Sequence, residues 1–129
     1  MTTLNLIDSL SSHGLYVWDN FLNKDKVQAI KECIPDTLQD ARIGHLGSLQ
    51  DNKNIRGDLT VWLDPEMGEP IAGYMAKMDA IRLKLNREFY LGLQDFETHF
   101  SRYPSGTFYK KHTDNPRSQN RRKITSVLY

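Results

Sequence analysis

Two side chains that can bind a metal ion stand two residues apart within residues 109–116, YKKHTDNP. Side chains alternate faces along a β-strand, so His112 and Asp114 would point the same way, roughly 6–7 Å apart. An imidazole nitrogen and a carboxylate oxygen are two of the three ligands in the 2-His-1-carboxylate site of non-haem Fe(II). The same pattern also fits a surface histidine and an aspartate in a turn before Pro116. The surrounding sequence must decide between these two interpretations.

The composition is that of a globular chain with one domain. Of the 129 residues, 39% are hydrophobic and 26% are charged, which argues against a disordered or membrane-embedded protein. Seventeen basic and sixteen acidic residues leave a net charge of +1, which gives no general attraction to nucleic acid. Cys33 is the only cysteine, so an internal disulfide is excluded. The amino terminus has neither a signal peptide nor a membrane anchor, and we expect a cytoplasmic protein.

Three helices are predicted ahead of the histidine and aspartate. Apolar residues at three- and four-residue steps indicate a helix that ends at Gly14, a second that Asn23 caps and Pro35 ends, and a third over residues 71–89. The apolar side of the third helix is predicted to lie in the core. These helices would support the strands that carry the candidate metal ligands.

Strands dominate the rest of the chain. Alternating polar and apolar residues predict strands at 15–18, 59–63, 96–103, 107–114 and 124–129. Residues 44–57 contain three glycines and are expected to form a long functional loop. Helices followed by antiparallel strands indicate an α+β domain. Because the chain stops inside its last strand, residues 1–129 are expected to form a domain that is incomplete at its C-terminus.

Two separated motifs carry a resemblance to a known family. Residues 99–129, HFSRYPSGTFYKKHTDNPRSQNRRKITSVLY, resemble the iron-binding region of the Fe(II)/2-oxoglutarate-dependent prolyl hydroxylases, in particular the bacterial relatives of the hypoxia-sensing enzymes. Upstream, Ile55-Arg56-Gly57-Asp58 followed by Trp62 resembles a second signature of that family. Weaker similarity to the same family covers the remainder of the chain. Two motifs in the right order favour the oxygenase interpretation over the surface histidine.

The resemblance implies a fold and a set of site residues. The fold would be a double-stranded β-helix, or jelly roll, with N-terminal supporting helices and with its C-terminal strands missing. Fe(II) would be held by His112 and Asp114, with no catalytic residue beyond the metal ligands, and 2-oxoglutarate would contact Tyr103 and Tyr129. An ion pair between Asp58 and Arg122 is expected, as is a pocket wall that includes His99, Tyr109 and Thr125.

The same resemblance implies a reaction and a partner. The enzyme would hydroxylate a prolyl residue of a protein substrate with Fe(II) and 2-oxoglutarate, and with ascorbate as reductant. The family's third ligand is a later histidine, yet no histidine follows His112. We therefore expect the 129-residue chain to be inactive and to self-associate. Two alternatives stay open: a truncated non-catalytic interaction module, and a nucleic-acid-modifying oxygenase of the same superfamily.

Overall fold

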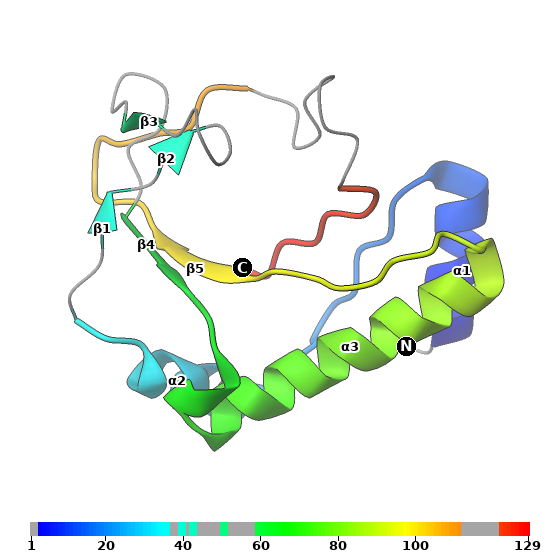
Figure 1. The fold of residues 1–129 in the computed structure, drawn as a ribbon, viewed down its shortest axis with the longest axis horizontal. Coiled ribbons are helices and arrows are strands. Elements are labelled where there is room, and N and C mark those ends of the chain that lie inside the picture. The colour runs from blue at the N-terminus through cyan, green and yellow to red at the C-terminus, as the bar shows by residue number, and fades with distance from the viewer. Residues whose placement is uncertain (1–2, 37–38, 41, 44–49, 52–58, 112–121) are drawn as a thin grey trace. The chain divides into compact units, whose positions relative to one another are not determined.

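The computed structural model describes residues 3–36, 39–40, 42–43, 50–51, 59–111 and 122–129 (Figure 1). The chain forms two compact units, and each unit is built from two separate segments. Met1–Ile34 and Asp64–Phe96 form the helical unit, whereas Pro35–Leu63 and Glu97–Tyr129 form the strand unit. Within the part of the chain that is described, no helix is long and apolar enough to cross a membrane.

Two short helices open the helical unit, and both follow the predicted boundaries. Helix α1, Thr3–His13, ends at Gly14, which adopts a φ of +75° while its amide donates to the Leu10 carbonyl oxygen at 3.0 Å. Helix α2, Lys24–Cys33, begins where the Asn23 side chain accepts a hydrogen bond from the Lys26 amide at 2.8 Å. The glycine and the asparagine thus supply the end and start signals expected of them.

Residues 15–18 do not form the predicted strand. They run as irregular chain between the first two helices, and Leu15 and Val17 are exposed. An isolated strand has no stabilising partner, because its backbone groups need a neighbouring strand for hydrogen bonding. Its two aromatic residues make edge-to-face contacts instead: the Trp18 ring lies 5.9 Å from the Tyr16 ring and 4.9 Å from the ring of Phe21, which follows the segment, measured between ring centroids.

Helix α3, Glu69–Phe89, is the longest element of the helical unit. It follows the short 3-10 helix η1, Pro65–Met67, which the Asp64 side chain caps. Ile71 and Leu85 of α3 are buried, as their place in the apolar pattern predicts. The helix ends at Tyr90, which adopts a left-handed conformation with its amide bonded to the Asn86 carbonyl oxygen at 2.8 Å.

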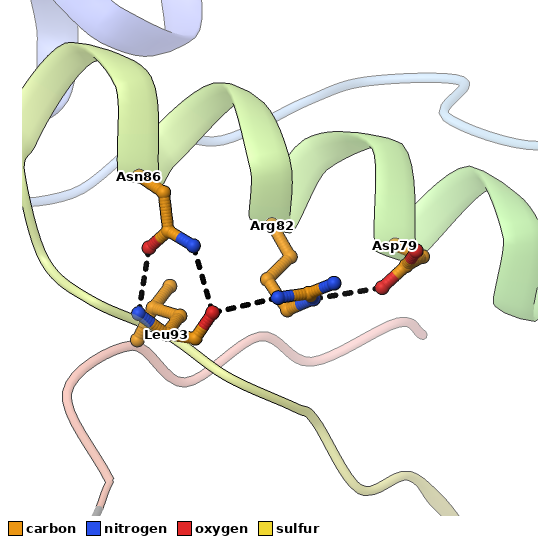
Figure 2. Close-up of polar contacts among 4 residues, drawn as sticks. All are labelled: Asp79, Arg82, Asn86 and Leu93. Carbon is orange, nitrogen blue, oxygen red and sulfur yellow. Dashed lines mark hydrogen bonds and ion pairs between the residues drawn. The ribbon is translucent and has the colours of Figure 1, made fainter.

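Side chains of α3 hold the segment after the helix by hydrogen bonds, and we call this group, Arg82, Asn86 and the Leu93 backbone, the polar clamp (Figure 2). The Asn86 side chain accepts a hydrogen bond from the Leu93 amide and donates one to the Leu93 carbonyl oxygen, both at 2.7 Å. Arg82 donates a second bond to that carbonyl at 2.6 Å and pairs with Asp79 at 2.7 Å. The backbone of Leu93 is therefore fully bonded by side chains of one helix face.

The described residues of the strand unit form two small antiparallel sheets. In the first, the order is β1 (Gln39–Asp40), β4 (Leu59–Trp62) and β5 (His99–Arg102). In the second, β2 (Arg42–Ile43) pairs with β3 (Gln50–Asp51). Strands β4 and β5 lie within the predicted strands 59–63 and 96–103. Strand β3 interrupts the predicted loop 44–57, and the rest of that loop lies outside the described residues.

Helices together with antiparallel strands give the expected α+β class. Two other predicted strands are not formed where the structure describes them. Residues 107–111 contain only an isolated β-bridge at Tyr109, and residues 122–129 are irregular and exposed. The alternating pattern of residues 124–129 suits a strand, but pairing requires a partner, and none of the described strands pairs with this segment.

Candidate functional site

The candidate site residues that the structure describes all lie in the strand unit. Strands β4 and β5 pair with Trp62 opposite His99 and Thr60 opposite Ser101. Residues two apart on a strand share a face, so these four side chains lie on the same side of the sheet. The Trp62 and His99 rings meet edge-to-face, with centroids 5.0 Å apart and an interplanar angle of 65°. The sheet therefore presents an indole and an imidazole side by side.

Tyr103 follows β5 directly, at the start of a turn. The turn is closed by Thr107, whose amide and hydroxyl both donate to the Pro104 carbonyl oxygen, at 3.0 and 2.6 Å. Gly106 takes a φ of +84°, a conformation that glycine adopts without steric cost. The Tyr103 side chain is 46% exposed and Tyr109 is half-buried. A phenol hydroxyl in such a position can donate to a carboxylate ligand.

Arg122 makes an ion pair that the sequence did not predict. Its guanidinium donates to the Glu97 carboxylate at 2.8 Å, and the two side chains are 55% and 60% exposed. The predicted partner, Asp58, lies outside the described residues, so that pairing stays a prediction. Glu97 and Arg122 are 25 residues apart. Patterns of neighbouring residues cannot predict an ion pair at that separation. The opposite charges of the two side chains were the one signal in the sequence.

The predicted metal ligands His112 and Asp114 lie outside the described residues. Among the residues that are described, no group of three or more His, Cys, Asp and Glu side chains could hold a metal ion. His99 instead contacts Trp62, as a residue of the pocket wall could. Thr125 and Tyr129 are exposed, and their predicted roles as pocket wall and 2-oxoglutarate contact stay predictions.

Comparison with known proteins shows which proteins the chain is similar to. No protein-family model matches the chain, and no curated protein matches it. A solved structure does match, and it confirms the predicted resemblance: the chain is prolyl hydroxylase-like.

One matching structure is a prolyl-4-hydroxylase from Pseudomonas putida. The two chains are 39% identical and superpose with a TM-score of 0.73 over 84% of this chain. The match covers 58% of the Pseudomonas chain, so this chain spans little more than half of that enzyme's length.

Proposed function

We propose that this chain forms the iron-binding part of a dioxygenase that depends on Fe(II) and 2-oxoglutarate and hydroxylates a prolyl residue of a protein substrate. The similarity to the Pseudomonas prolyl-4-hydroxylase, at 39% identity over most of the chain, is the observation that carries this proposal. The fold of the complete domain would be a double-stranded β-helix. The short antiparallel sheet β1-β4-β5 would be one part of it.

Different residues of the strand unit would bind Fe(II) and 2-oxoglutarate. His112 and Asp114 would hold Fe(II), which leaves positions open for 2-oxoglutarate and oxygen. Tyr103, whose side chain is half-exposed at the end of β5, would donate its hydroxyl to 2-oxoglutarate. Tyr129 would donate to the distal carboxylate of the same cosubstrate. Trp62 and His99 would form a wall of the pocket and help to exclude water from it.

Bound iron and 2-oxoglutarate would together supply the oxidising chemistry: 2-oxoglutarate would be converted to succinate and CO2, with one oxygen atom of O2 entering succinate and the other entering the prolyl residue as a hydroxyl group. Ascorbate would keep the iron reduced. The sequence after His112 contains no further histidine, so the 129 residues hold two of the three family ligands. We therefore propose that turnover requires residues beyond Tyr129, which would supply a third ligand and an arginine for 2-oxoglutarate.

The test compares the 129-residue chain with a form that continues past Tyr129. Both are incubated with Fe(II), 2-oxoglutarate, ascorbate and a library of proline-containing peptides. Succinate is quantified, and hydroxylated peptides are detected by their gain of one oxygen atom. We expect succinate and hydroxyproline from the longer form only, and both products should be lost in its His112→Ala variant. A longer form that binds iron yet makes neither product would contradict the proposal.

One observation favours a second candidate function, an interaction module without catalysis. The described C-terminal residues 122–129 are exposed and carry apolar side chains, among them Val127 at 66% and Leu128 at 45% exposure. Apolar side chains exposed in this way can form contacts with another chain. Light scattering after size-exclusion chromatography tests this alternative. A concentration-dependent oligomer that Val127→Lys dissolves would support it.

A further inference from the structure

A cavity between two helices of the helical unit is unrelated to the proposed iron site. It is a half-open pocket of about 300 Å³ between α2 and α3, at the small end of the range for ligand pockets. Ala29 and Ile30 line it from α2, and Pro70 and Tyr74 line it from α3. Most of its surface is apolar, so it suits a hydrocarbon chain better than a polar molecule.

Gly73 opens this cavity. It lies inside the 21-residue helix α3, where glycine costs about 1 kcal/mol relative to alanine. A Cβ atom built on Gly73 would meet nothing within 4 Å, so packing does not require the missing side chain. The space next to this glycine belongs to the cavity, which would shrink if a larger residue stood there.

Two lysines contribute positive charge to the cavity. Lys26 of α2 and Lys77 of α3 both line it. The Lys77 ammonium donates to the Phe21 carbonyl oxygen at 2.7 Å and lies 4.0 Å from the Phe21 ring centroid. Burial lowers the pKa of Lys77, and the charge of Lys26 lowers it further. The two ammonium groups therefore repel each other, and an anion bound between them would be stabilised by both charges.

Lys77 keeps hydrogen-bonding capacity for such an anion. An ammonium has three N–H donors, and one of them is used by Phe21. The carboxylate of Glu69 also lines the cavity and would repel a second negative charge on a ligand. A single carboxylate on an apolar chain therefore matches the cavity better than a dicarboxylate such as 2-oxoglutarate.

From these contacts we infer that the cavity between α2 and α3 is a binding site for a small apolar monocarboxylate, with its hydrocarbon chain beside Gly73 and its carboxylate between Lys26 and Lys77. This site is independent of the proposed hydroxylase function, because all of its residues belong to the helical unit.

Hexanoate is the probe that tests this site. The ¹⁵N-labelled chain is titrated with hexanoate, and amide chemical shifts are followed by NMR. We expect saturable shifts at Ile30, Gly73 and Tyr74, with a Kd on the order of 1 mM. Hexan-1-ol and hexylammonium have the same chain without the negative charge, and glutarate has two carboxylates. Each of these three compounds should bind at least about fivefold more weakly.

Variants test separately how the lysine charges and the cavity volume contribute to hexanoate binding. Lys26→Gln and Lys77→Gln should each weaken hexanoate binding about fivefold, whereas Lys84→Gln, on the same helix but outside the cavity, should leave it unchanged. Gly73→Leu should abolish binding without lowering the melting temperature, because leucine fills the cavity and favours the helix.

Three results would overturn the inference: shifts that never saturate, hexan-1-ol binding as tightly as hexanoate, or undiminished binding by Gly73→Leu. If Lys77→Gln does not fold, Lys26→Gln still decides whether charge contributes.

Discussion

His99 and Trp62 face each other across neighbouring antiparallel strands, with their rings in edge-to-face contact 5.0 Å apart between centroids. An aromatic pair of this geometry stabilises a sheet by about 0.5–1.5 kcal/mol. The contact places the imidazole of His99 against an indole that is itself 56% exposed. His99 is exposed on this face of the sheet, and its predicted place in the pocket wall stays a prediction.

Iron binding should accordingly depend on His112 and Asp114 and be independent of His99. We expect His112→Ala and Asp114→Ala to lower the affinity of the 129-residue chain for Fe(II) at least about tenfold, because each removes one of two ligands. His99→Ala should change that affinity less than twofold. Anaerobic titration with Fe(II), followed by calorimetry, provides the measurement. A loss in His99→Ala as large as that in His112→Ala would mean that His99 is a ligand.

The observed Glu97–Arg122 ion pair and the predicted Asp58–Arg122 ion pair should differ in strength. The Glu97 pair is more than half exposed on both sides, so Glu97→Gln should lower the free energy of unfolding by less than about 1 kcal/mol. Asp58→Asn should cost about 3–5 kcal/mol if the predicted Asp58 pair is buried. Urea unfolding of the two variants, with Arg122→Gln beside them, measures both values. Equal small effects in all three would rule out a buried Asp58–Arg122 pair.

Asn86 should contribute strongly to the stability of the helical unit. Asn86→Ala removes both of its bonds to the Leu93 backbone and leaves a part-buried amide without its acceptor, which should cost about 1–3 kcal/mol. Arg87→Ala, at the exposed neighbouring position, is the matched control and should cost less than about 0.5 kcal/mol. Urea unfolding followed by circular dichroism compares them. If the two variants unfold together, the clamp shown in Figure 2 adds no net stability.

Lys77 should make stability depend on pH in the alkaline range. Burial, and then the Lys26 charge, hold its pKa in the folded protein below the usual value of 10.5. Between the folded pKa and 10.5 the unfolded chain binds more protons, so stability should rise as the pH increases through this window. Lys26→Gln should raise the pKa of Lys77 part of the way toward 10.5, because burial remains. NMR titration of the lysine side chains gives the pKa directly. An unchanged Lys77 pKa in that variant would exclude Coulomb coupling between the two lysines.

The helices could be predicted from the sequence because their signals are local. Asn23 caps α2 through an amide three residues away, Gly14 ends α1 through a carbonyl four residues back, and Ile71 and Leu85 lie on one apolar side of α3. Each of these signals acts within a few turns of helix, where backbone geometry alone fixes which groups meet. The resemblance to prolyl hydroxylases was also readable from the sequence, through the two motifs around Asp58 and His112.

Tertiary structure decided what depends on distant partners. Residues 15–18 and 124–129 have strand-like patterns, yet neither segment forms a strand, because pairing needs a neighbour that the pattern itself cannot supply. Arg122 meets Glu97 across 25 residues of sequence, and Lys77 meets Phe21 across 56. Contacts at such separations arise only when the packing of whole elements offsets the entropy of closing the intervening chain, and no local pattern encodes that balance.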